Sequence, residues 1–296
     1  MARKKKFNRS AEDLGNIVEL EHVNVTIPDQ TLATLFYVTG LGLTRDPFQM
    51  TSVTNMWVNA GQSQFHLPTR GEQVLRGRIG LVMPNLDGLV KRLESVRGPL
   101  EHTQFDYAIP NGNDVVDVIC PWGNRFRCHL ASEAFAPMAF GMPYVQFDVP
   151  QGSAKGIARF YREMLGAGAS VGKWDRAKAA RIGAGYRQEL IFRETKQPIP
   201  DFDQHHIQIY IADFSGPHKR LLDRGLVTEE SNQWQYRFED ITDLDDDNVL
   251  FTIEHEVRSM THPLYARPKL NRNPDETIRN YMHGQETIPW TIPYNA

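Results

Sequence analysis

A repeated pattern of strand and helix signals constrains the fold of this 296-residue chain more than any other feature. Four stretches begin with an alternating run that closes on a turn-forming residue, and apolar residues at helical spacing follow each of them. Shorter extended runs then lead to a final polar–apolar alternation. The stretches can be compared by the distance from a polar residue of the first strand to a polar residue of the last strand. This distance is 44, 49, 45 and 48 residues, for His22 to His66, Arg78 to Arg127, Tyr144 to Glu189 and His206 to Glu254. Such near-equal repeats predict one β-α-β-β-β unit used four times.

A single unit of this kind cannot bury one face of its sheet by itself. Two units side by side would form a curled sheet around a cavity, with their helices outside. We expect consecutive units to pair, which gives an N-terminal domain at residues 17–135, a C-terminal domain at 136–260 and an extended arm at 261–296. The predicted fold class is α+β, with four units forming two cupped mixed β-sheets.

Alternation along the strands predicts which side chains line the second cup, because successive side chains of a strand point to opposite faces. The expected lining residues are Tyr144, Gln146, Glu189, His206, Gln208, Glu254 and Glu256. One imidazole with up to three carboxylates suits a borderline divalent ion. A polar interior in which His206 pairs with Glu254, without an ion, is the alternative. His205 and His255 would face the opposite way.

The first cup would have a different lining, which consists of His22, Asn24, His66, Arg78, Arg125 and Arg127. Arginine stays protonated and repels a cation, so we expect no metal in this cup. Either the cup binds an anion, or Arg78 and Arg127 pair with neighbouring carboxylates. We favour the ion pairs.

Several of these segments resemble a known family. They are His22-Val-Asn-Val, Gly40-Leu-Gly-Leu, Gln64-Phe-His66-Leu, His206-Ile-Gln-Ile and Thr252-Ile-Glu254. The segment from Cys120 to Arg127 is similar to a D-P-x-G-N-x-x-E ending, with Cys120 in place of Asp and Arg127 in place of Glu. Over residues 17–260 the chain resembles the vicinal oxygen chelate superfamily, which comprises glyoxalases, bleomycin-resistance proteins and extradiol dioxygenases. The family's metal ligands come from the first and last strands of paired units. The matching positions here are Tyr144, in place of the usual His, with Glu189, His206 and Glu254.

The lining and the resemblance together imply a metal-dependent enzyme in which His206, Glu189 and Glu254 bind a divalent ion. The ion could be Fe, Zn, Ni, Mn or Co. The expected activity is that of a glyoxalase-like lyase or isomerase, acting on a small oxygenated substrate through an enolate-like intermediate. Glu256 or an unbound Glu189 would move the proton, and Tyr144, Gln146 and Gln208 would contact the substrate. An extradiol-type dioxygenase, which would need a second histidine, and a non-catalytic small-molecule-binding protein are the alternatives.

Net charge, apolar runs and cysteine content limit the classes of binding partner and the cellular compartment that we expect. A net charge of −3 argues against nucleic-acid binding. We find neither an apolar run long enough for a membrane span nor a signal-peptide core. Two cysteines on one extended segment, Cys120 and Cys128, suit a reducing compartment. We therefore expect a cytoplasmic protein with a small-molecule substrate. The arm, rich in proline and aromatic residues, is expected to pack on the chain's own second cup or on a partner subunit of a homodimer.

Overall fold

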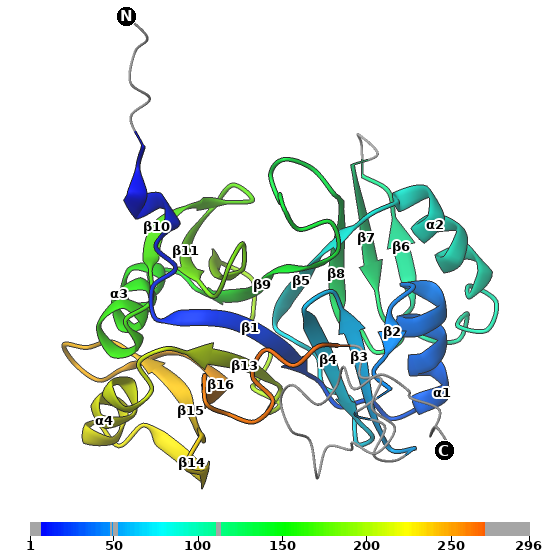
Figure 1. The fold of residues 1–296 in the computed structure, drawn as a ribbon. Coiled ribbons are helices and arrows are strands. Elements are labelled where there is room, and N and C mark those ends of the chain that lie inside the picture. The colour runs from blue at the N-terminus through cyan, green and yellow to red at the C-terminus, as the bar shows by residue number, and fades with distance from the viewer. Residues whose placement is uncertain (1–6, 48, 50–52, 111–113, 270–296) are drawn as a thin grey trace, which may run out of the picture.

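The computed structural model of the protein describes residues 7–47, 49, 53–110 and 114–269. After a short helix η1 (Arg9–Glu12), the β-α-β-β-β unit occurs four times, which confirms the predicted fold class (Figure 1). The first unit consists of β1 (Ile17–Asn24), α1 (Gln30–Ala33) continued by the π-helix η2 (Thr34–Gly40), β2 (Thr44–Arg45), β3 (Asn55–Ala60) and β4 (Ser63–Pro68). The second consists of β5 (Gly77–Met83), α2 (Leu86–Ser95), β6 (Asp106–Ala108), β7 (Val115–Ile119) and β8 (Arg125–Leu130). The third consists of β9 (Gly141–Pro150), α3 (Ala154–Leu165), β10 (Ala169–Trp174), β11 (Ala177–Gly183) and β12 (Glu189–Thr195). The fourth consists of β13 (His206–Ile211), α4 (Ser215–Asp223), β14 (Val227–Asn232), β15 (Gln235–Thr242) and β16 (Val249–Ser259).

Local signals explain where the helices begin and end. The Asp29 side chain accepts hydrogen bonds from two free N–H groups in the first turn of α1, and the Asn85 side chain accepts one from Gly88 in the first turn of α2. Helix α3 ends at Gly166, and Gly225 follows α4, both with φ of 69°. Glycine adopts this left-handed conformation without a steric penalty, so it stops a helix sharply.

The strands form two eight-stranded sheets whose composition differs from the expected one. The terminal sheet, with order β14-β15-β16-β13-β1-β4-β3-β2, joins the first unit to the fourth. The middle sheet, with order β10-β11-β12-β9-β5-β8-β7-β6, joins the second unit to the third. The expectation that consecutive units pair, as residues 17–135 and 136–260, is therefore corrected. Each join is an antiparallel pairing of two first strands, β1 with β13 and β5 with β9. Every unit offers such a strand, so local sequence leaves the partner open.

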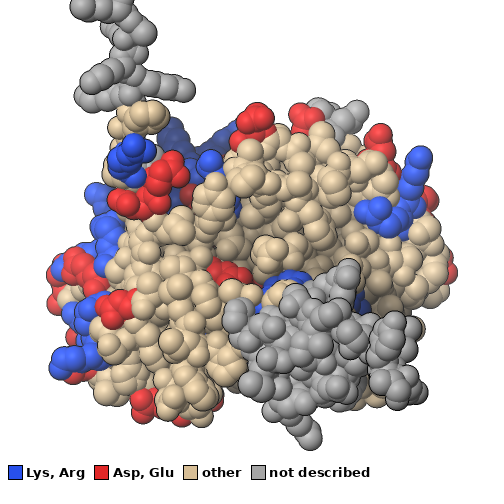
Figure 2. Space-filling view, in the orientation of Figure 1, with Lys and Arg blue, Asp and Glu red and all other residues tan. Residues whose placement is uncertain are grey.

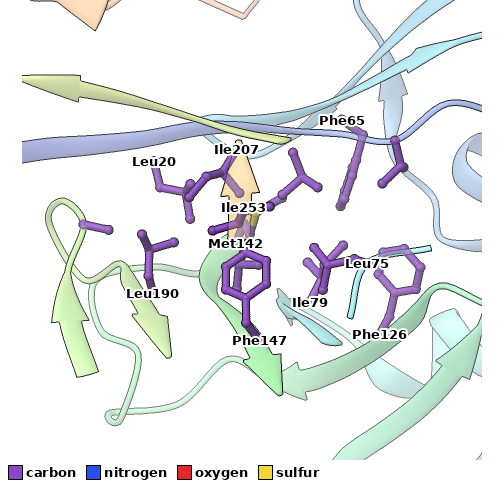
Figure 3. Packing of buried hydrophobic residues seen from close by; sticks show 14 of the residues in the cluster. Leu20, Phe65, Leu75, Ile79, Phe126, Met142, Phe147, Leu190, Ile207 and Ile253 are labelled. Atoms are coloured by element: carbon purple, nitrogen blue, oxygen red, sulfur yellow. The ribbon is translucent and has the colours of Figure 1, made fainter. Parts of the chain in front are cut away.

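The hydrophobic core lies between the two sheets, as Figure 3 shows. Leu20, Phe65, Ile207 and Ile253 come from the terminal sheet and meet Ile79, Phe126, Phe147 and Leu190 of the middle sheet. Helix α3 contacts strands of both sheets, and α1 with α2 lies at the other end of the molecule (Figure 1). Since strand side chains alternate between faces, the residues that lie between these core positions, such as His206 and Gln208 of β13, point away from the core.

The surface in Figure 2 shows acidic and basic side chains interspersed near α3 and α4. Such mixing agrees with the small net charge of −3. Within the described residues, no helix is long and apolar enough to cross a membrane.

Candidate metal centre

Two rows of polar side chains cross the four central strands of the terminal sheet. The strand register aligns His66 of β4, Asn24 of β1, His206 of β13 and Glu254 of β16 in one row. Two residues along each strand, it aligns Gln64, His22, Gln208 and Glu256 in a second row. Residues two apart on a strand share a face, so both rows lie on the side away from the core.

Three histidines converge at the centre of these rows. One ring nitrogen each of His22, His66 and His206 lies within 4.8 Å of the others. The ring centroid of His22 is 5.9 Å from that of His66 and 5.6 Å from that of His206. His22 and His206 are buried, and the Nε2 atom of each has no hydrogen-bond partner among the described residues. Buried polar atoms are almost always bonded, so this pair of orphaned nitrogens indicates a missing partner.

A neighbouring carboxylate orients His22. A bulge interrupts the β1–β13 pairing between Leu20 and His22, and bulges re-aim side chains next to sites. His22 donates through Nδ1 to Glu21 Oε2 at 2.6 Å. Burial alone would raise the pKa of Glu21, but Lys269 and the hydrogen bond from His22 lower that pKa well below its usual range. The ionised Glu21 holds a proton on Nδ1, so Nε2 is the atom of His22 that would bind an ion.

The imidazoles of His66 and His206 are held neutral. Burial lowers the pKa of His66 to about 2. Burial and the positive charge of Arg237 also lower the pKa of His206 well below its usual value. The ring of His66 stacks on Trp57 with centroids 3.8 Å apart. Neutral imidazole is the form that binds a metal, so the donor set suits a divalent cation.

His66 already has partners for both nitrogens. Asn24 donates to its Nδ1 at 2.6 Å, and its Nε2 donates to Asn55 Oδ1 at 2.8 Å. It would therefore exchange one of these hydrogen bonds for an ion.

The two glutamates of β16 lie beside His206 but are paired with guanidinium groups. Glu256 Oε2 is 3.6 Å from His206 Nε2, and Glu254 Oε1 is 3.9 Å from His206 Nδ1, beyond hydrogen-bond distance. Arg237 pairs with both carboxylates, and Arg258 contacts Glu256 at 2.5 Å. Burial opposes ionisation of Glu256, yet the charges of Arg258 and Arg237 lower its pKa. The pKa of Glu254 is raised, mainly by burial.

The described start of the arm, residues 261–269, reaches this centre from the end of β16. Arg267 is buried and bonds Asp46 at 2.9 Å. Asn59 donates to the Lys269 carbonyl at 2.9 Å, and Lys269 Nζ donates to Glu21 Oε1 at 2.8 Å. This part of the arm thus packs on the first unit of its own chain. Residues 270–296 lie outside the described residues.

The structure brings together only some of the residues expected in one site. His206, Gln208, Glu254 and Glu256 share the terminal sheet. Tyr144, Gln146 and Glu189 lie on β9 and β12 of the middle sheet, where Glu189 pairs with Arg181 at 2.7 Å. The expectation that Glu189 and His206 share a cup is therefore corrected. His255 faces the core as expected and bonds the Tyr161 hydroxyl at 2.6 Å.

The first-cup expectation is corrected as well. The sequence pattern groups His22 and His66 with Arg78 and Arg127, and it predicts no metal in that cup because arginine repels a cation. Arg78 and Arg127 instead lie in the middle sheet and pair with Asp175 and Asp117, which confirms the favoured ion pairs. His22 and His66 complete the histidine cluster.

Comparison with known proteins supports the architecture. No protein-family model and no curated protein sequence matches the chain. Among solved structures, a proposed dioxygenase from Bacillus subtilis is 14% identical, covers 90% of this chain and 90% of its own, and superposes with a TM-score of 0.57. Glyoxalase I from Zea mays is 11% identical, covers 81% of this chain and 92% of its own, and gives a TM-score of 0.58. At such low identity the likeness shows a shared fold.

Proposed function

We propose that this chain, which has the fold of the vicinal oxygen chelate superfamily, is a divalent-metal-dependent enzyme acting on a small oxygenated substrate. His22, His66 and His206 would bind the ion. The observation that carries the proposal is their convergence within 4.8 Å, with two buried Nε2 atoms lacking partners. Three histidine ligands with an open coordination position are typical of catalytic rather than structural metal sites.

A divalent ion bound there would supply Lewis-acid chemistry to a substrate oxygen. Gln208 is buried in the same row as His22, and neither its amide oxygen nor its amide nitrogen has a hydrogen-bond partner among the described residues. We assign it to orienting the substrate. The ionised Glu256, next to His206, is the carboxylate placed to accept a proton from a substrate carbon. Its pairing with Arg237 and Arg258 fixes its position. These roles fit a lyase or isomerase.

A ring-cleaving dioxygenase is the second candidate, and the additional histidines favour it. That chemistry needs at least two imidazole ligands and adjacent open positions for substrate and oxygen. His22 and His66 supply the imidazoles that His206 alone could not. The candidates differ in their need for oxygen. Oxygen uptake with iron(II) and a panel of catechols would identify a dioxygenase, whereas turnover under anaerobic conditions would identify a lyase or isomerase.

Metal analysis of the purified protein tests the common premise. We expect stoichiometric divalent metal in the wild type and in His218→Ala, since His218 lies on α4 and bonds Glu230 at 2.8 Å, outside the site. We expect strong loss of metal in His22→Ala and His206→Ala. Cobalt(II) absorption gives a second readout that does not depend on activity. Equally negligible metal in wild type and His206→Ala would contradict the proposal. Full ligand binding after chelator treatment would instead favour a non-catalytic binding protein.

A further inference from the structure

The middle sheet has its own counterpart of the histidine centre, built from different chemistry. Its register aligns Arg127, Gly80, Tyr144 and Glu189 in one row, as the terminal sheet aligns His66, Asn24, His206 and Glu254. Arg78 aligns with Gln146 in the next row, as His22 aligns with Gln208. Where one sheet offers imidazole lone pairs, the other offers guanidinium donors. Guanidinium groups match carboxylate and phosphate oxygens, not cations.

A cavity of about 320 Å³ is lined by Arg127 of the first row and by Arg78 and Gln146 of the second. This volume is at the lower end of the range for small-molecule sites. Four arginines line the cavity, Arg78, Arg125, Arg127 and Arg193. Three aspartates pair with these arginines and also line it, Asp117, Asp148 and Asp175.

Two of these aspartates belong to the sheet itself. Asp117 on β7 accepts hydrogen bonds from Arg127 Nε at 2.6 Å and from Arg127 Nη2 at 2.7 Å. Asp148 on β9 lies 3.1 Å from Arg193 and 3.4 Å from Arg125. They fix the arginines to other strands of the same sheet, which is a structural role.

Asp175 is different, because it enters the cavity from the exposed turn between β10 and β11. It and Arg176 have φ of 44° and 66°, so this turn holds two non-glycine residues in the left-handed region. One carboxylate oxygen, Oδ2, contacts Arg78 Nη2 and lies 3.6 Å from Arg127 Nη1. Burial opposes its ionisation, but Arg78, Arg127 and Arg193 together lower the pKa of Asp175. A carboxylate on a surface turn thus satisfies two arginines of the cavity.

We propose that this cavity is a binding site for a small molecule bearing a carboxylate or phosphate group, and that Asp175 is an internal ligand which the anion displaces. The side chain of Asp175 is 40% exposed whereas that of Arg78 is 15% exposed, so the carboxylate forms the solvent side of this pair and the guanidinium its buried side. Arg78 Nε is buried without a hydrogen-bond partner among the described residues, so Asp175 does not satisfy the whole guanidinium group. The site is separate from the histidine centre and does not depend on a bound metal.

If the anion must displace the Asp175 side chain, Asp175 lowers the apparent affinity of the site for that anion, and this effect can be measured. Asp175→Asn removes the competing charge and keeps a residue that tolerates the left-handed turn. We expect it to bind inorganic phosphate or malonate about tenfold tighter than the wild type, within the range of typical coupling. Asp245→Asn is the matched control, since Asp245 is 76% exposed and pairs with Arg159 outside the cavity.

Isothermal titration of phosphate and of malonate, at constant ionic strength, tests the proposal, and the tighter of the two anions identifies the phosphoryl or the carboxylate class. Adding Arg78→Gln to Asp175→Asn should abolish the gain. No tightening in Asp175→Asn relative to Asp245→Asn would overturn the proposal, and so would unchanged binding in the double variant. Trp174 donates to Gln146 at 2.9 Å and reports on the turn by fluorescence. Asp175→Gly, which also fits the turn, replaces Asp175→Asn if the latter unfolds.

Discussion

Glu21 contacts both Lys269 and His22, so substitutions at this pair can separate an effect on metal affinity from an effect on the stability of the fold. Lys269 Nζ is 2.8 Å from Glu21 Oε1, and Glu21 Oε2 is 2.6 Å from His22 Nδ1. Both charged side chains are largely buried, with 5% exposure for Glu21 and 11% for Lys269. The perturbation is Glu21→Gln, which keeps the size of the side chain and removes its charge.

Two effects of different size are expected. Losing a carboxylate that orients a metal-binding histidine typically weakens metal affinity by about 10- to 100-fold, or roughly 1.4–2.8 kcal/mol. Removing one partner of a buried ion pair leaves the other charge uncompensated, and Glu21→Gln should lower the free energy of unfolding by about 3–5 kcal/mol. An exposed pair gives the reference value, since Glu163→Gln, opposite Arg159, should cost at most about 1 kcal/mol.

The double variant Glu21→Gln/Lys269→Met distinguishes the two effects. Removing both charges should restore most of the stability, because replacing a whole buried pair is often close to neutral. The metal affinity should stay low, since His22 still lacks its carboxylate. Denaturant unfolding of the metal-free protein measures the first quantity, and competition with a chelator measures the second. If metal affinity recovered together with stability in the double variant, Glu21 would have no role in orienting His22.

Two further predictions concern groups outside the centre. Burial, then Glu21, raises the pKa of Glu19 from 4.5 to about 7, so the folded chain keeps a proton that the unfolded chain loses as pH rises through this window. The free energy of unfolding of the wild type therefore falls by up to about 3 kcal/mol as pH rises between these values. In urea unfolding, the stability of Glu19→Gln relative to the wild type should rise by that much between pH 5 and 8. A difference between the two proteins that does not change with pH would refute the assignment. A Cβ on Gly77 would lie 1.8 Å from the Gln146 carbonyl oxygen, so Gly77→Ala should cost about 3 kcal/mol or more by the same measurement. Gly98→Ala is the control, because no atom lies within 4 Å of its new methyl group, and it should change stability by less than about 0.5 kcal/mol. Equal losses of stability in the two variants would show that β5 and β9 move apart to accommodate the methyl group at Gly77.

The units were predictable because their signals are local. Alternation in β13 places Ile207 and Ile209 in the core and His206 with Gln208 on the other face, and the structure has this arrangement. The same rule places Glu254 and Glu256 beside His206. Side-chain direction within a strand depends only on its backbone period, so it can be inferred without knowing the neighbouring strands.

The pairing of units was not predictable from such signals, because an edge-to-edge join depends on strands far apart in the chain. One clue was present. The first strands of the first and fourth units carry a histidine at the compared position, His22 and His206. The first strands of the second and third units carry Arg78 and Tyr144 there. Grouping units by the chemistry of their first strand would have joined the first to the fourth. It would have separated His22 and His66 from the arginines that argued against a metal.

This pairing means that neither half of the chain can contain the centre. The first half supplies His22 and His66, and the last unit supplies His206 and the glutamates, so the donor set forms only when β1 joins β13. The arm then returns from β16 to the first unit, where Lys269 meets Glu21 behind His22. The β1–β13 pairing and the assembly of the histidine cluster therefore depend on each other, because the same strand carries Leu20 into the core and His22 into the cluster. A substitution that weakened the β1–β13 join should therefore lower metal affinity even where it touches no ligand, while the arginine cavity of the middle sheet, held by β5 and β9, would keep its geometry.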